Sequence, residues 1–297
     1  MPAPGSQTAT AFGASPAYWG WRATRSSWVS RTTGTPAFAA AAAAGVPVTR
    51  LSHAELKARQ PQFAELAADD VAVWDPGAGI CYPERNVRAH VEAARRLGAE
   101  IRTGTTVTGI EEDQDGVTVH TSTAELRAAR VIVTAGAELG TLIPSLPVTP
   151  RPIPLTWFRA HDPGEFTLEN FPAFIWRRPD GNGLWGHGSD EDYRIKIGLD
   201  LERIPSPERF VAELSAVVAG ALPGLDPRPV EVKPCIVTDS PDGQFLAGRR
   251  TERIIVATGD SGHGFKHTAG VGELLAQLAT GEATYCPTDF LDPNRFD

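Results

Sequence analysis

The stretch from residue 253 to residue 281 constrains the fold more than any other part of this sequence. A short β-rich run, Ile254 to Val256, leads into three closely spaced glycines, Gly259, Gly262 and Gly264. Apolar residues then recur at the spacing of an amphipathic helix, and they are Val271, Leu274, Leu275 and Leu278. This periodicity predicts a strand, a glycine-rich turn and a helix in direct succession.

This strand–turn–helix unit has the features of a site for a negative or electron-rich group. Glycines let backbone N–H groups approach a ligand closely, and the start of a helix carries a partial positive charge. Lys266, in or just before the first helical turn, adds a full positive charge, and Gly281 is placed to end the helix. The alternative is an ordinary connection between a strand and a helix, with a tight turn and no ligand. We favour the ligand site.

Composition and charge exclude several classes of protein. With 297 residues, of which 41% are hydrophobic and 22% charged, the chain is typical of soluble globular proteins with one large or two medium domains. A net charge of −8 at pH 7, without a basic stripe, argues against nucleic-acid binding. We see no apolar run long enough to span a membrane and no signal-like segment, so we expect a cytoplasmic protein. The three cysteines, Cys81, Cys235 and Cys286, fit neither a disulfide framework nor a zinc pattern, and we expect no metal site.

The first 46 residues differ from those that follow. Small residues, Thr, Pro and Gly dominate them, and no apolar strand runs into a glycine-rich turn. We expect loop there, disordered at its start, with one helix at 37–44. Beyond residue 46, Ser52 and Glu55 predict a capping box at the start of a helix, and 71–74 reads as a strand.

The segment from residue 75 to residue 143 indicates α/β structure. A helix is predicted at 84–97. Short strands are predicted at 100–102, 107–110, 117–120 and 130–134. The run Val131 to Val133 is continuously apolar, which predicts a strand buried on both faces of a parallel sheet, and it leads to a glycine turn at Gly136.

The middle of the chain has a different character. Five prolines between residues 144 and 154 predict an extended crossover. Antiparallel strands, with a hairpin at Asp180-Gly181, are then predicted at 155–158, 173–176, 183–186 and 193–198. A helix at 207–221 and a strand at 230–238 precede the return to the strand–turn–helix unit.

The order of these segments predicts two domains, one inserted into the other, with a cleft between them. The fold class is α/β plus α+β: a doubly wound, Rossmann-like nucleotide-binding domain that is incomplete at its N-terminus, and an inserted antiparallel-sheet substrate domain. The predicted boundaries are 1–46 for a divergent segment, 75–150 and 241–297 for the nucleotide-binding domain, and 47–74 and 151–240 for the substrate domain.

The C-terminal motif resembles that of a known family. Gly259-Asp-Ser-Gly-His-Gly-Phe-Lys266, followed by residues 270–279, is similar to the C-terminal signature of monomeric sarcosine oxidases and N-methyltryptophan oxidases. These enzymes belong to the D-amino-acid-oxidase-like superfamily, which uses FAD. The resemblance covers roughly residues 47 to 290, and it extends back through 233–246, 194–198, 131–136 and 75–79.

The resemblance implies roles for individual residues. Cys235 matches the cysteine that bonds covalently to the flavin, and Lys266 matches a lysine near the flavin that promotes reaction with oxygen. The backbone of Gly262 to Lys266 would lie against the pyrimidine edge of the ring. The expected cofactor-binding residues are Gly136, Cys235, Gly259, Gly262, His263, Gly264, Phe265 and Lys266.

The sequence also departs from the family. The family begins with an apolar strand, a GxGxxG turn that binds the pyrophosphate and an acidic residue that binds the ribose, and residues 1–45 contain none of these. Asp200 stands where the family has a substrate-pocket histidine, and Val237 where it has a tyrosine. Arg22 and Arg25 are the nearest match to a pair of family arginines. We expect either a truncated or altered N-terminus, which we favour, or a loss of tight flavin binding.

The resemblance implies an FAD-dependent amine or amino-acid oxidase. The expected reaction oxidises the C–N bond of a small secondary or N-methylated amino acid, and O2 reoxidises the flavin to give H2O2. Lys266 and Asp200 are the expected catalytic residues, although Asp200 could equally be a surface carboxylate. Trp185 and His187 would line a pocket or pack in the core. We expect a monomer or weak oligomer; the alternatives are a non-catalytic paralogue that no longer binds FAD, and a flavoenzyme with another electron acceptor.

Overall fold

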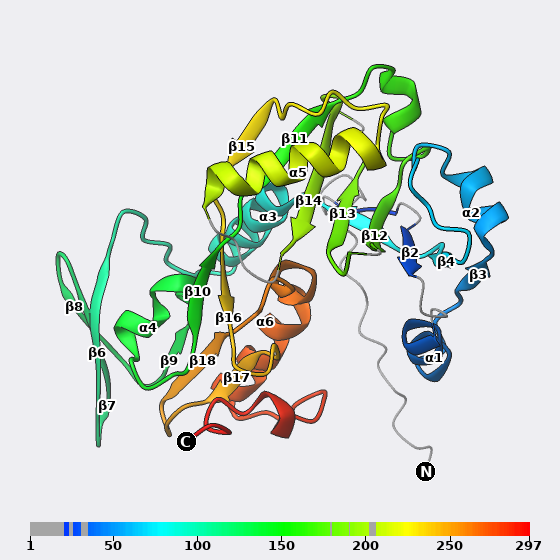
Figure 1. Ribbon diagram of the computed structural model, residues 1–297. Coiled ribbons are helices and arrows are strands. Elements are labelled where there is room, and N and C mark those ends of the chain that lie inside the picture. The colour runs from blue at the N-terminus through cyan, green and yellow to red at the C-terminus, as the bar shows by residue number, and fades with distance from the viewer. Residues whose placement is uncertain (1–20, 24–25, 31–34, 179, 190, 202–205) are drawn as a thin grey trace, which may run out of the picture. The chain divides into compact units, whose positions relative to one another are not determined.

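The computed structural model describes residues 21–23, 26–30, 35–178, 180–189, 191–201 and 206–297 (Figure 1). It divides into two compact units, each formed by separate stretches of the chain. Unit 1 comprises 1–101, 159–200 and 220–225, and unit 2 comprises 102–158, 201–219 and 226–297. The two units are described separately below. Much of the divergent segment 1–46 lies outside the described residues, as do Arg25 and the side chain of Arg22.

Unit 1 is built on a mixed sheet. Its strands follow the spatial order β14–β13–β12–β2–β4–β3. Their bounds are Arg194–Asp200, Gly183–His187, Ala173–Arg177, Ser26–Ser30, Val71–Asp75 and Thr49–Leu51. The pairs are antiparallel except for β12 with β2, which run parallel. A separate antiparallel pair joins β1 (Trp21–Ala23) to β5 (Gly79–Cys81).

One face of this sheet is buried against an aromatic cluster. Phe63 lies 5.0 Å from Phe174 and 5.4 Å from Trp176 between ring centroids, in edge-to-face geometry that favours aromatic packing. The helical elements of this unit are α1 (Thr35–Ala43), α2 (His53–Arg59), α3 (Pro83–Arg96) and the 3-10 helix η3 (Pro163–Phe166). The predicted capping box is confirmed at the start of α2, where the Ser52 side chain and the Glu55 side chain each bind the other residue's backbone N–H.

Unit 2 contains the sheet that carries the C-terminal motif. The order β17–β18–β9 places β9 (Val131–Val133) parallel to β18 (Ile254–Thr258), and β17 (Leu246–Arg249) antiparallel to β18. Helix α6 (Gly264–Thr280) packs against these strands through Leu274 and Leu275 (Figure 1). The predicted strand, glycine turn and helix are therefore confirmed.

The rest of unit 2 consists of small sheets and short helices. Strands β6, β7 and β8 form an antiparallel meander, β10 pairs with β16, and β11 pairs with β15. The strand bounds are Val107–Asp113, Gly116–Thr121, Glu125–Ala128, Thr149–Pro152, Ile236–Asp239, Leu155–Arg159 and Glu231–Lys233. The helical elements are η2 (Gly136–Glu138), α4 (Leu139–Leu142), α5 (Pro207–Ala221) and η4 (Asp289–Leu291).

Four predictions of local structure were wrong or incomplete. Residues 100–102 form no strand and are exposed, because no strand pairs with them in the described structure. The single strand predicted at 230–238 is two strands, β15 and β16, because each half pairs with a different partner. Strands β1, β2, β3, β5 and β8 were not predicted. Ile132 is 42% exposed, so β9 is not buried on both faces in the described structure.

Within the described residues, every helix is too short or too polar to cross a lipid bilayer.

Candidate functional site

Unit 2 brings together three sequence segments that were predicted to bind the cofactor. They are the glycine turn (residues 259–262), strand β16, which follows Cys235, and η2, which begins at Gly136. The backbone N–H of Ser261 donates to the carbonyl of Thr238 in β16 at 3.0 Å. Strand β16 also contacts η2. The turn and η2 therefore both border β16.

The glycine turn has an unusual backbone. Gly259, Ser261 and Gly262 all have positive φ, at 65°, 48° and 84°. This conformation is accessible to glycine but disfavoured for serine. Hydrogen bonds hold Ser261 in it, because its Oγ accepts the backbone N–H of Ser240 at 3.2 Å and donates to the carbonyl of Gly259 at 3.2 Å. The turn is thus a defined structure rather than a loose loop.

Asp260 caps the start of α6. Its Oδ2 accepts the backbone N–H of Gly264 at 3.0 Å, and its carbonyl accepts that of His263 at 2.7 Å. A Cβ at position 264 would lie 2.5 Å from this oxygen, which explains the glycine there. The sequence prediction missed Asp260, because it lies four residues before Gly264, outside the N-cap position where a capping residue is expected.

The start of α6 carries surplus positive charge. No acidic side chain lies in its first turn, whereas His263 and Lys266 are both exposed there. Since the helix dipole also makes this end positive, basic side chains are electrostatically unfavourable here unless a negative group is bound. The pKa of His267 is lowered from its ordinary value by partial burial first, and then by the nearby positive charge of Lys266 and of His263. The arrangement suits a negatively charged or electron-rich ligand.

Cys235 lies at the break between β15 and β16. Two backbone hydrogen bonds join Cys235 to Ile153. The Ile153 N–H donates to the Cys235 carbonyl at 2.7 Å, and the Ile153 carbonyl accepts the Cys235 N–H at 3.1 Å. The side chain is half-buried and forms no disulfide, and the next residue, Ile236, is 56% exposed. The thiol is therefore carried by a backbone that two hydrogen bonds hold in place.

The residues present fit the ring of FAD better than its pyrophosphate. The Oγ1 of Thr258, directly before the turn, is buried and has no hydrogen-bond partner among the described residues. A Cβ at Gly136, whose φ is 55°, would point into open space. Together with the positive start of α6, these features fit an electron-rich ring edge. Residues 1–45 lack the GxGxxG sequence expected to bind the pyrophosphate.

Asp200 belongs to unit 1, whereas the other predicted site residues belong to unit 2. It ends β14, and its Oδ1 accepts the indole N–H of Trp185 at 3.1 Å. Arg177 Nη1 lies 4.0 Å from Oδ2. The carboxylate is about half-exposed, so these partners leave it accessible. His187 lies on the neighbouring strand, with its Nδ1 2.7 Å from the carbonyl of Gly188. Catalytic use of Asp200 stays a prediction.

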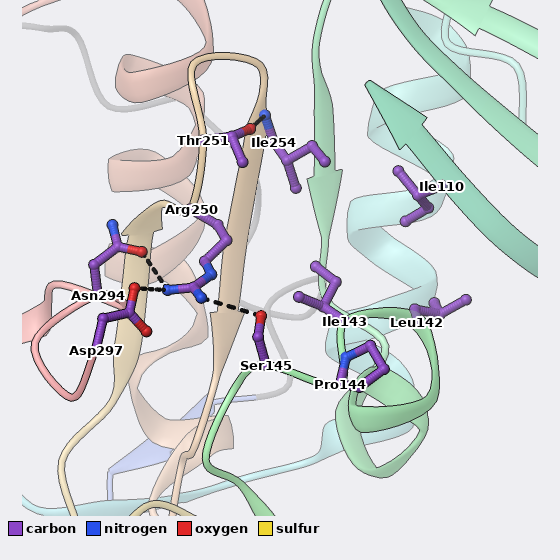
Figure 2. Close-up of a pocket in the computed structure, with 10 residues that line it drawn as sticks. All are labelled: Ile110, Leu142, Ile143, Pro144, Ser145, Arg250, Thr251, Ile254, Asn294 and Asp297. Carbon is purple, nitrogen blue, oxygen red and sulfur yellow. Dashed lines mark hydrogen bonds and ion pairs between the residues drawn. The ribbon is translucent and has the colours of Figure 1, made fainter. Parts of the chain in front are cut away.

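A pocket of about 420 Å³ also lies in unit 2. Figure 2 shows Arg250 bonded to Asn294, Asp297 and Ser145 on one side, with Ile143 among the apolar residues on the other. None of its lining residues was predicted as a site residue. Among all the described residues, no group of three or more His, Cys, Asp or Glu side chains is placed to hold a metal ion.

Comparison with known proteins identifies relatives of this chain. The model of the family described as FAD dependent oxidoreductase matches residues 12–278. Monomeric sarcosine oxidase from Streptomyces avermitilis is 30% identical over 267 residues, which are 84% of this chain and 69% of that protein. N-methyl-L-tryptophan oxidase from Citrobacter koseri is 29% identical, with the same two shares covered.

Solved structures show the same fold. NikD, described as an unusual amino acid oxidase essential for nikkomycin biosynthesis, superimposes with a TM-score of 0.77 at 22% identity, over 92% of this chain and 77% of that one. L-proline dehydrogenase from P. horikoshii gives a TM-score of 0.79 at 21% identity, over 94% and 78% of the two chains. At these identities the likeness establishes the fold alone.

Proposed function

Because this chain belongs to the family of FAD dependent oxidoreductases, we propose that it oxidises the C–N bond of a small secondary or N-methylated amino acid. When bound, FAD would accept the hydride equivalent from that bond and deliver both electrons to O2, giving H2O2, while water hydrolyses the imine product. The named functions of the relatives, sarcosine oxidase at 30% identity and N-methyl-L-tryptophan oxidase at 29%, support this substrate class.

The open, positively charged start of α6 is the observation that carries the proposal. The backbone of Gly262 to Lys266 would border the electron-rich edge of the cofactor, next to Gly136 and Gly259. Lys266 adds a full charge that stabilises negative charge developing at the site during substrate oxidation and the reaction with oxygen. The thiol of Cys235, on its hydrogen-bonded backbone, would form the covalent link.

The proposal also divides the chain by role. The cofactor would be bound by residues 75–150 and 241–297. The substrate would be bound by residues 47–74 and 151–240. Residues 1–46 form a divergent segment that precedes both. On the substrate side, the accessible carboxylate of Asp200 would pair with the amine of the substrate. An amine is positively charged at neutral pH, so a carboxylate is a suitable partner.

A second candidate is a non-catalytic paralogue that does not bind FAD. The observation behind it is that residues 1–45 contain no GxGxxG sequence, the turn after which a helix start holds the pyrophosphate. Most of the other features of the site are compatible with either candidate.

The visible absorption spectrum of the purified protein separates the two. We expect a yellow protein, either as purified or after incubation with FAD. If the protein stays colourless after this incubation, the proposal that this chain is an FAD-dependent enzyme is rejected, and the non-catalytic paralogue is favoured.

Acid precipitation then tests the covalent link. Colour should stay with the pellet in the wild type and pass to the supernatant in Cys235→Ala. Cys81→Ala and Cys286→Ala are matched controls, because both are also half-buried cysteines that form no disulfide. Colour released equally from the wild type and Cys235→Ala would exclude the link while leaving flavin binding intact.

A further inference from the structure

The C-terminal tail, residues 289–297, packs on the rest of unit 2 through Leu291, which lies in a buried cluster with Ala247 and Leu274, and through a hydrogen bond from Asn294 to the carbonyl of Arg249. Two arginine anchors add to these contacts. At the first anchor, Arg295 forms a bidentate pair with Asp242, with Nη2 2.8 Å from Oδ1 and Nε 3.0 Å from Oδ2. The same guanidinium donates to the carbonyls of Gln244 at 3.2 Å and Phe245 at 3.1 Å. Its side chain is only 15% exposed, so the pair is well shielded on the arginine side.

The second anchor lies on the hairpin between β17 and β18. There Arg250 donates to the side chains of Asn294 and Asp297 of the tail, and to the Oγ of Ser145 at 3.0 Å (Figure 2). This anchor therefore joins the tail to the hairpin and to the loop after α4. The two anchors hold the same short tail but lead to different parts of unit 2.

The first anchor continues to the glycine turn. The Ser240 hydroxyl lies 2.7 Å from the carbonyl of Gln244 and 3.2 Å from Asp242 Oδ1, so it bonds to two groups that Arg295 also contacts. Asp242 Oδ1 also accepts the backbone N–H of Gln244 at 3.0 Å. Ser240 is buried, and its backbone N–H donates to Ser261 Oγ at 3.2 Å. A Cβ at Gly259 would lie 3.0 Å from Ser240 Cβ, so the two segments are in close contact. An unbroken line of contacts thus runs from Arg295 to the turn.

The turn depends on such support. Ser261 has a φ of 48°, which is disfavoured for a residue with a side chain, and such a conformation persists only where the surroundings hold it. The support comes from Thr238, through the Ser261 N–H, and from Ser240, through the Ser261 hydroxyl. Loss of order at Ser240 would therefore release one of the contacts that hold the turn.

We propose that Arg295 and Asp242 are positioning residues: by docking the C-terminal tail, they hold Ser240 and Ser261 in place and so set the affinity of the glycine turn for its ligand. The inference rests on the proposed function for the identity of that ligand, FAD. The mechanical link between the tail and the turn is independent of it.

Arg295→Gln and Asp242→Asn test this link, and Arg250→Gln is the matched control because it releases the same tail at the other anchor. Amide hydrogen exchange is measured first, in the FAD-free protein. We expect peptides covering 258–266 to exchange about tenfold faster in Arg295→Gln and Asp242→Asn, and at the wild-type rate in Arg250→Gln. Peptides covering 292–297 should exchange faster in all three variants.

The second measurement is the FAD dissociation constant, by fluorescence titration in a Cys235→Ala background that keeps the cofactor exchangeable. We expect it to rise about tenfold in Arg295→Gln and Asp242→Asn and to stay within about twofold of the parent in Arg250→Gln. Arg295→Lys, which keeps the charge but loses the bidentate geometry, should give a smaller change in both measurements. It also provides a test if Arg295→Gln does not fold.

The outcomes distinguish this inference from the proposed function. If Arg250→Gln loosens the turn as much as Arg295→Gln does, or if neither changes its exchange, the link is refuted. Faster exchange of the turn in a chain that binds no FAD upholds the link and rejects the proposed function. Equal FAD affinity in all variants, with FAD bound, rejects the inference and leaves the proposed function standing.

Discussion

The two ends of helix α6 differ in how nearby charges match the helix dipole. At its C-terminal end, Gly281 adopts a left-handed φ of 81°, and its N–H donates to the carbonyl of Gln277 at 2.9 Å. Arg130 Nη1 donates to the carbonyl of Ala279 at 2.9 Å, and Arg249 donates to that of Leu278. At the N-terminal end, the Asp260 carboxylate caps the helix while basic side chains crowd its first turn.

This difference separates an end of α6 that follows the rules of helix stability from an end that we propose binds a ligand. The C-terminal end satisfies its carbonyls and places positive charge at the negative end of the helix dipole, as stability requires. The N-terminal end breaks the same rule, because its exposed cations face the positive end. The Asp260 carboxylate offsets part of this positive charge, and we expect a bound ligand to supply the rest of the compensation.

Replacing Lys266 tests the functional end and should have the largest effect. We expect Lys266→Gln to lower kcat/KM about 100-fold, because one charge that stabilises the transition state is lost. The melting temperature should stay equal or rise, since a cation is removed from the positive end of a helix. Peroxide release with an N-methylated amino acid and thermal denaturation measure the two effects. Lys57→Gln, on α2, should change neither. A destabilised variant with full activity would make Lys266 a structural residue.

Replacing Arg249 tests the stabilising end. Arg249→Gln leaves the carbonyl of Leu278 without this donor, and we expect the free energy of unfolding to fall by about 1–2 kcal/mol. Urea denaturation measures it, and FAD titration should show unchanged affinity. Arg228→Gln is the control, because Arg228 is exposed and pairs only locally, with Asp226. Weaker FAD binding in Arg249→Gln would show that the two ends are not independent.

The C-cap glycine should have a smaller effect. Gly281→Ala places a side chain in a left-handed conformation, so we expect a loss of about 1 kcal/mol in the free energy of unfolding. Gly272→Ala, in the interior of α6 with open space around its Cβ, should instead stabilise the protein by about 0.5–1 kcal/mol. Equal changes in both variants would contradict the assignment of Gly281 as the cap.

The smallest expected effect is on the protonation of His267. Partial burial and the charges of Lys266 and His263 hold its pKa below the ordinary value of 6.5. The folded state therefore binds this proton less readily than the unfolded state, so stability is lost as pH falls below about 6.5. In Lys266→Gln the pKa should rise, but stay below its ordinary value because burial remains. An NMR titration of His267 measures this, and an unchanged pKa would show that Lys266 is not close to it.

Short-range features could be predicted from the sequence because neighbouring residues are sufficient to form them. The capping box of Ser52 and Glu55 spans three residues, and the stop at Gly281 depends on one glycine. The strand–turn–helix unit from 254 to 280 was predictable for the same reason. In the capping box and at Gly281 the hydrogen bonds close within a turn, so the pattern contains the whole explanation.

Features that depend on distant partners could not be predicted. The break at Cys235 arises because β15 pairs with β11 while β16 pairs with β10. Strand β2 forms between β4 and β12, neither of which is adjacent to it in the sequence. Pairing of this kind depends on long-range contacts, which the periodicity of a single segment does not encode.

The sequence by itself determined the glycine turn, the helix after it and the positive charge of Lys266, since these follow from local residue types. Only the tertiary structure decided what holds the turn in place. Ser240 contacts Ser261 of the turn across 21 residues of sequence, and Arg295 contacts Asp242 across 53. Asp200 falls in the other unit. The physical reason is that hydrogen bonds and packing act through space, whereas a sequence pattern reports only on residues that are close along the chain.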